Sequence, residues 1–188
     1  MTIVFVTGNA RKVGEARLAC DAYGIEIEQK ALDIKEIQSN KPQEISEHKA
    51  REAFEVIEKP LVVTDTFFHI PALNGFPGPY MKYVAEWFTP QDFIHLMADK
   101  KDKRIMFSEN ITYVDKNETK FFSKEFWGVI VDTPRGKGNS IEDVAEFEGH
   151  TLGERRAQGG FSHKAEDYVW IDFATWFKAK SHNVDKTQ

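Results

Sequence analysis

Hydrophobic and polar residues follow two different periods in the first third of the chain. Residues 2–6 contain a short continuous apolar run, which is typical of a buried parallel strand. Residues 10–22 then place Val13 and Ala16 on one helical face. Gly24 follows the expected end of that helix. Strands that alternate with helices indicate an α/β fold. The same patterns predict strands at 25–29 and 61–64 and a helix at 44–58.

The second half of the chain changes character. Residues 103–136 read as two long strands joined by a turn at 115–117, which predicts an antiparallel hairpin. Residues 136–162 are rich in glycine and charge, so we expect loops with short elements there. A last helix is predicted at about 163–178, and the tail after residue 180 is expected to fray.

Composition narrows the class of protein. The 188 residues suit a single domain over 1–188 with two lobes, of which the antiparallel lobe lies at about 103–135. The net charge of −5 argues against a nucleic-acid binder, and there is no apolar run of the ~20 residues that a membrane span needs. A single cysteine fits a reducing cytoplasm, the expected location.

A short polar turn follows the first strand. Thr7, Gly8 and Asn9 precede the helix, and Lys12 lies in its first turn. Free backbone N–H groups and the positive end of a helix bind phosphate at such a place. The alternative is an ordinary cap, with Asn9 accepting helix N–H groups and Lys12 in solvent. Both interpretations stay open on this stretch alone.

Two acidic residues and a lysine are further candidates. Asp65 directly follows the apolar run at 61–64, and the carboxyl end of such a strand holds ligands in open α/β sheets. A carboxylate there can bind Mg²⁺, take a proton from water or cap a turn. Glu36 lies in a loop, where a single glutamate is usually a solvated charge. Lys49 falls on the inner face of its helix, where it needs a partner or a ligand unless its ammonium reaches solvent.

These segments together resemble the inosine triphosphate pyrophosphatase family, whose members act on non-standard purine nucleoside triphosphates. The resemblance covers most of the chain in the same order. Its most specific part is LVVTDTFFHIPALNGFPGPYMKY, which resembles an acidic loop followed by a glycine–proline turn. The other matching segments are VFVTGNARKV, SEHKAREA, GVIVDTPRG and FSHK, the last of which resembles a serine–histidine–arginine triplet.

The resemblance implies a fold, a reaction and a set of roles. The fold is a mixed twisted sheet with flanking helices, two lobes around a central cleft and a long antiparallel hairpin, usually in a homodimer. The reaction converts a nucleoside triphosphate to monophosphate and pyrophosphate with Mg²⁺, or Mn²⁺, as cofactor. Glu36 and Asp65 would bind the metal and activate water. The triphosphate would be held by Thr7, Asn9, Lys12, Lys49 and Thr66, and the base by Ser162, His163, Lys164 and Asp143.

The chain departs from the family pattern at three places. Thr64 stands where the family usually has Glu or Asp, which removes one carboxylate from the acidic centre. The family's F-G-W-D-P segment is absent, and residues 140–143 are the nearest match. Lys164 replaces the arginine of the triplet, and lysine cannot make arginine's planar bidentate contact. Most of these losses fall on base recognition, whereas the phosphate-binding residues are nearly complete.

Three hypotheses therefore stay open. The first is a pyrophosphatase for ITP, XTP or their deoxy forms. The second is the same hydrolysis of a nucleotide with a different or modified base. It is motivated by residues 136–164, which differ from the family pattern. The third is a nucleotide-binding protein without turnover, motivated by Thr64. Under the first hypothesis, donors at Ser162–Lys164 would read the 6-oxo group of the base, so we expect firm rejection of ATP and weaker discrimination against GTP.

Overall fold

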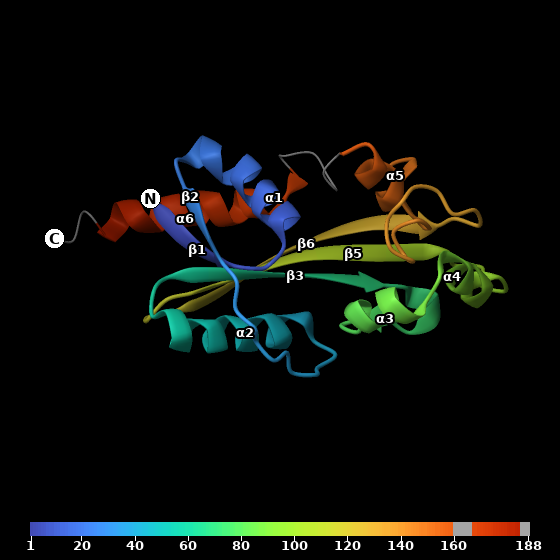
Figure 1. Cartoon of the computed structure of the whole chain (residues 1–188), viewed down its shortest axis with the longest axis horizontal. Helices are drawn as coiled ribbons and strands as arrows, with labels where there is room; N and C mark the ends of the chain where they lie inside the picture. The colour runs from blue at the N-terminus through green and yellow to red at the C-terminus, as the bar shows by residue number, and fades with distance from the viewer. Residues whose placement is uncertain (160–166, 185–188) are drawn as a thin grey trace. The chain divides into compact units, whose positions relative to one another are not determined.

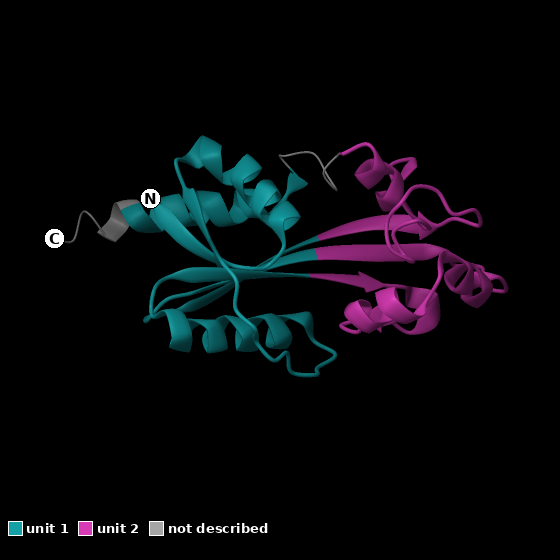
Figure 2. Ribbon diagram, viewed as in Figure 1, with its two compact units in different colours: residues 1–65, 109–124, 163–188 teal, residues 66–108, 125–162 magenta. Residues whose placement is uncertain are grey.

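The computed structural model of the chain describes residues 1–159 and 167–184 (Figure 1). Its fold is mixed α/β, as the sequence predicts. The chain divides into two compact units (Figure 2). Strands β3, β5 and β6 contribute residues to both units. The prediction of one domain with an antiparallel lobe at about 103–135 stays a prediction. Unit 1 comprises residues 1–65, 109–124 and 163–188, and unit 2 comprises residues 66–108 and 125–162.

Unit 1 contains the sheet that carries most of the candidate site. Its strand order is β2-β1-β3-β5-β6, and β1 pairs in parallel with both β2 and β3. The apolar residues 3–6 of β1 are all buried, because both faces of a central parallel strand are covered. A turn at 115–118 joins β5 to β6 and makes the predicted hairpin. The strands span Thr2–Val6 (β1), Glu26–Lys30 (β2), Leu61–His69 (β3), Arg104–Val114 (β5) and Thr119–Ile130 (β6).

Helices cover both faces of this sheet in unit 1 (Figure 1). Helices α1 and α6 lie against one face, where the rings of Phe5 and Trp170 meet edge to face with centroids 5.0 Å apart. Helix α2 lies against the other face and packs Ala50 and Ala53 into a core that includes Val63. These two cores fix α1 and α2 on opposite faces of β1 and β3. The helices span Ala10–Cys20 (α1), Pro42–Ile57 (α2) and Val169–Val184 (α6).

The predicted end of β3 is wrong. The strand continues past residues 61–64 to His69, so Asp65 lies within the strand and not after it. It continues because the phenylalanines that follow are again buried. However, Phe5 pairs with Val62, and β1 ends one residue after Phe5. Asp65 therefore lies just beyond the carboxyl end of β1, which preserves the reason for expecting a ligand there.

The predicted bounds of the last helix also need correction. Helix α6 continues to Val184, beyond the predicted end at residue 178 and the expected fraying after 180. Lys180 Nζ donates to Asp115 Oδ2 at 2.7 Å, and Ser181 Oγ donates to a backbone oxygen of the preceding turn at 2.9 Å. These bonds hold turns that the sequence suggested would fray. The predicted helix start at about residue 163 lies outside the described residues.

Unit 2 has its own core and contains the short elements predicted within 136–162. Its strand order is β3-β5-β6-β7-β8, and β4 pairs antiparallel with β3. Phe93, Met97 and Ile105 are fully buried at its centre. The unit's further elements are Pro77–Gly78 (β4), Met81–Trp87 (α3), Pro90–Met97 (α4), Ala145–Phe147 (β7), His150–Thr151 (β8) and Leu152–Ala157 (α5).

Candidate active site

The turn after β1 is closed by its own side chains. Asn9 is the N-cap of α1, and its Oδ1 accepts the N–H groups of Arg11 at 3.0 Å and Lys12 at 3.4 Å. Thr7 Oγ1 in turn accepts the N–H of Asn9 at 3.1 Å. Gly8 is exposed, and a Cβ there would meet no atom within 4 Å. Asn9 therefore caps the helix, and the phosphate-binding roles of Thr7 and Asn9 stay predictions.

Lys12 is directed toward β3 rather than into solvent. Its Nζ donates to the backbone oxygen of Thr64 at 3.2 Å. Burial lowers the pKa of Lys12, and the nearby Asp65 carboxylate opposes that shift while Lys49 reinforces it. An anion that approached this ammonium would stabilise its charged form. The sequence-based alternative with Lys12 in solvent is therefore not what the structure shows.

Lys49 bridges the two predicted carboxylates. Its Nζ lies 2.7 Å from Glu36 Oε1 and 2.8 Å from Asp65 Oδ1. The Asp65 side chain is 12% exposed and the Glu36 side chain 50%. Burial acts to lower the pKa of Lys49, but attraction to Asp65 and Glu36 outweighs it and raises the pKa. The fold thus brings one carboxylate from a loop and one from a strand to a single lysine on a helix.

Two buried side-chain oxygens of β3 lack a hydrogen-bond partner within the described part of the chain. They are Asp65 Oδ2 and Thr64 Oγ1, on consecutive residues of β3. A buried polar atom that is left unpaired costs ~1–3 kcal/mol. Because Lys49 already binds Asp65 Oδ1, the second oxygen of the same carboxylate remains for a ligand.

The family resemblance implies Mg²⁺, and the two carboxylates fit part of a Mg²⁺ shell. This ion is usually bound by one or two carboxylates, with phosphate oxygens and water at its other positions. Asp65 Oδ2 and the half-exposed carboxylate of Glu36 supply such ligands. No three His, Cys, Asp or Glu side chains in the described residues are grouped to hold a metal. The phosphates of a nucleotide would therefore have to supply much of the shell.

The remaining predicted residues belong to unit 2 or lie outside the described residues. Asp143, in unit 2, accepts the N–H of Gly138 at 2.6 Å, and a Cβ added at Gly153 would lie 2.0 Å from the same oxygen. Asp143 therefore organises its own loop, and its base-binding role stays a prediction. Thr66 is half-buried on β3, in unit 2. Ser162, His163 and Lys164 lie outside the described residues.

A second acidic pair near Lys12 was missed by the sequence analysis. Glu15 on α1 is buried and forms an ion pair with Arg11, while Glu109 on β5 is 6% exposed. Burial raises the pKa of Glu109 to about 8, and the charge of Glu15 adds to the shift. The backbone N–H of Val169 and the cations of α1 act in the opposite direction. The signal that could have revealed Glu109 is that it is the one acidic residue in the sequence of its strand.

Replacing Glu109 with glutamine is expected to flatten the pH dependence of stability. The folded-state pKa of about 8 lies above the ordinary value of ~4.3, so folding favours the protonated acid. Its contribution is complete below ~4.3 and is lost as the pH rises toward 8, with a slope of about 1.4 kcal/mol per pH unit. Urea unfolding at pH 5, 6.5 and 8 measures this slope. Glu125→Gln, at an exposed position of β6, is the control. Equal slopes in wild type and Glu109→Gln would contradict the assignment.

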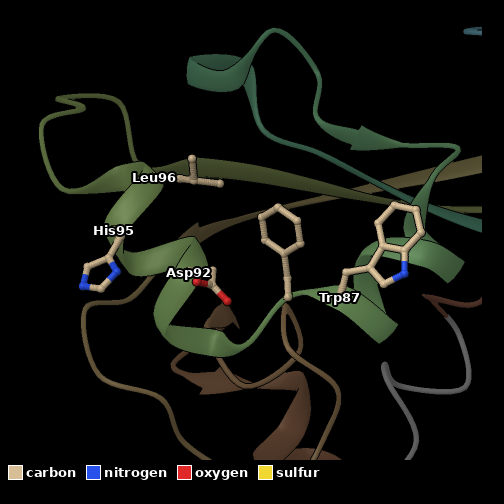
Figure 3. Close-up of a pocket in the computed structure, with 5 residues that line it drawn as sticks. Trp87, Asp92, His95 and Leu96 are labelled. Atoms are coloured by element: carbon tan, nitrogen blue, oxygen red, sulfur yellow. The ribbon is translucent and has the colours of Figure 1, made fainter.

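A separate pocket on unit 2 does not suit a triphosphate (Figure 3). It has a volume of about 420 Å³ and lies where α3 ends and α4 begins. Among the described residues no lysine or arginine lines it, and its carboxylate, Asp92, caps α4 through Thr89. An anion would be repelled there, so the Lys49 cluster remains the candidate site. The pocket is lined by Trp87, Phe88, Asp92, His95 and Leu96.

Comparison with known proteins identifies the family of this chain. The profile of the Ham1 family matches residues 3–161. The chain belongs to the Ham1 family. It is 31% identical over 182 residues to a protein of Methanopyrus kandleri named dITP/XTP pyrophosphatase, covering 95% of this chain and 97% of that relative. It is 34% identical over 157 residues to inosine triphosphate pyrophosphatase 2 of Trypanosoma cruzi, covering 81% and 80%.

Solved structures share the fold. The Ham1 protein of Coxiella burnetii superposes with a TM-score of 0.80 at 21% identity, covering 95% of this chain and 99% of that one. The Ham1 protein of Staphylococcus aureus gives a TM-score of 0.76 at 19% identity, covering 96% and 100%. At these identities the likeness establishes the fold, and it confirms the mixed α/β class predicted from the sequence.

Proposed function

We propose that this Ham1-family protein is a nucleoside triphosphate pyrophosphatase. Its substrates would be non-standard purine nucleoside triphosphates such as ITP, dITP and XTP, and its products the monophosphate and pyrophosphate. The observation that carries the proposal is the cluster in which Lys49 joins Glu36 to Asp65, with Lys12 directed at the same stretch of β3. Relatives of similar length that are named as pyrophosphatases for these nucleotides support it.

The chemistry requires charge neutralisation and positioning more than covalent participation. Lys12 and Lys49 would neutralise the triphosphate, and its binding would draw the ammonium of Lys49 away from the two carboxylates. Asp65 would accept a proton from the attacking water through Oδ1, the oxygen that Lys49 leaves when the triphosphate draws it away. A Mg²⁺ ion held by Glu36 and Asp65 would neutralise charge that develops on the phosphate oxygens. Water would thus cleave the anhydride bond between the α- and β-phosphates, and the products would be the monophosphate, pyrophosphate and a proton.

We also propose a metal cofactor, an assembly and a cellular location for the protein. Magnesium is supported by the two carboxylates and the family resemblance, and Mn²⁺ fits the same ligands. A homodimer is supported by the resemblance alone. A cytoplasmic location is supported by the single cysteine, Cys20, which is buried and unpaired. No helix among the described residues combines the length and the apolarity needed to cross a membrane.

A substrate panel tests the proposed base preference. We expect kcat/KM to be highest for ITP and XTP, and ATP to be rejected by up to ~10⁴-fold, because its 6-amino donor would face donors of the protein. GTP should be intermediate, since it keeps the 6-oxo group. The assay compares the four nucleotides under one condition with Mg²⁺. Cleavage of ATP as efficiently as ITP would refute the 6-oxo interpretation of Ser162–Lys164.

The loop at 135–143 favours keeping a different base as a second candidate. Where the family has F-G-W-D-P, this loop is tied to its flanking elements, with Arg135 paired to Glu146 of β7 and Glu142 paired to Arg156 of α5. A loop organised by ion pairs differs chemically from one that presents an aromatic ring. The same panel, extended to nucleotides with modified bases, would show this candidate as a preference for a substrate other than ITP.

A further inference from the structure

Strand β5 carries four buried polar residues where a buried strand is expected to be apolar, and two of them are Asn110 and Thr112. Asn110 is 2% exposed and Thr112 is fully buried. Their neighbours Ile111 and Tyr113 belong to the core under α1 and α6. Successive side chains of a strand point to opposite faces, so Asn110 and Thr112 share the other face, which is the side of α2. Both polar side chains are thus directed toward the face that carries the Lys49 cluster.

Each of these side chains bonds an element that carries a residue of the cluster. Asn110 Nδ2 donates to the backbone oxygen of Asp65 at 3.3 Å. Thr112 Oγ1 donates to Ser46 Oγ at 2.8 Å, and Ser46 is itself fully buried on α2. Ser46 precedes Lys49 by three residues, so the two lie on neighbouring positions of one helical face. One strand therefore bonds β3 at Asp65 and α2 one turn before Lys49.

The stabilising effect of these bonds does not by itself explain them. A buried hydrogen bond contributes ~0.5–1.5 kcal/mol net, and apolar pairs of the same shape can replace it at little cost. What apolar residues cannot supply is direction, because a hydrogen bond fixes both distance and angle. The two bonds instead fix the backbone positions from which Asp65 and Lys49 meet at 2.8 Å.

We propose that Asn110 and Thr112 are positioning residues for the Lys49–Asp65 pair. Asn110 holds the backbone of β3 at Asp65, and Thr112 holds α2 through Ser46, so that the carboxylate keeps its orientation when a triphosphate draws Lys49 toward its phosphates. The inference rests on the proposed pyrophosphatase function. It assigns neither residue a contact with the substrate.

The test compares steady-state kinetics of ITP hydrolysis for Asn110→Leu and Thr112→Val. We expect kcat per folded molecule to fall by about 10–100-fold, as for residues that orient catalytic ligands, with KM little changed. Thr112→Ser retains the hydroxyl and should restore kcat. Tyr113→Phe is the matched control, since it removes a 2.7 Å bond from a buried hydroxyl on the same strand to Asp115. It should lower the melting temperature without lowering kcat.

Crystal structures of the same variants separate this inference from the function on which it rests. We expect the separation of Lys49 Nζ and Asp65 Oδ1 to exceed hydrogen-bonding range, ~3.5 Å, in Thr112→Val. Normal kcat in both folded variants of an active enzyme would overturn the inference. If the wild type hydrolyses no triphosphate, the proposed function falls, and an unchanged 2.8 Å pair in Thr112→Val would overturn the positioning role independently. Thr112→Val is nearly isosteric, so it covers the case in which Asn110→Leu does not fold.

Discussion

Replacing Asp65 with asparagine is expected to lower kcat for ITP by about 10²–10⁴-fold, the usual contribution of a general base. Asparagine keeps the shape of the side chain, but it cannot take a proton from water. Lys49 keeps Glu36 as a partner at 2.7 Å, so we expect the fold and most of the triphosphate affinity to persist. Turnover measures the first effect, and binding of a non-hydrolysable triphosphate measures the second.

The chain offers a closely matched control for this substitution. Asp115 is also an aspartate bonded to a lysine, since its side chain is only 9% exposed and Lys180 Nζ lies 2.7 Å away. Asp115→Asn therefore removes the same charge from a similar ion pair outside the candidate site. We expect it to lower stability and to leave kcat unchanged. Wild-type turnover in Asp65→Asn would remove Asp65 from the reaction.

Lys49→Met is expected to weaken triphosphate binding far more than monophosphate binding. The lysine makes charge-assisted contacts, and losing one costs ~1.5–3 kcal/mol, or about 10- to 150-fold in affinity. Its removal also leaves Glu36 and Asp65 facing each other without the intervening cation, which adds repulsion toward an anionic ligand. Calorimetric titration with ITP analogue and IMP, each in the presence of Mg²⁺, measures the two losses.

Lys180→Met provides the comparison for that result. Lys180 also bridges two carboxylates, Asp115 and Glu118, and its side chain is 23% exposed against 19% for Lys49. Its loss should lower stability and leave nucleotide affinity unchanged. Equal losses of monophosphate and triphosphate affinity in Lys49→Met would place Lys49 away from the β- and γ-phosphates.

The parts of the site that the sequence could reveal are those with a local signature. Lys49 is visible because a lysine among inner-face helix positions requires a partner, and the structure supplies Glu36 and Asp65. The turn at Thr7–Asn9 is visible because a strand, a glycine and a capping residue follow one another. In both cases the pattern that reveals the residue is local, because it extends over only a few neighbouring positions in the sequence.

The parts that sequence reasoning missed depend on contacts between distant segments. The true end of β3 was missed because Thr64, Asp65 and Thr66 interrupt the apolar run, whereas sheet pairing carries the strand through them. Glu109 was missed because its environment comes from α1 and α6, on either side of it in the sequence. The pairing of Glu36 with Lys49 spans thirteen residues and requires the loop to fold back on α2.

The most direct test of the account is the identity of the phosphate products of ITP hydrolysis. The wild-type protein is incubated with ITP and Mg²⁺, and ³¹P NMR follows the products, with Asp65→Asn as the inactive reference. The account predicts that IMP and pyrophosphate appear together in equal amounts from the first turnover. Release of IDP and orthophosphate would contradict it, as would an absence of turnover when ITP is bound.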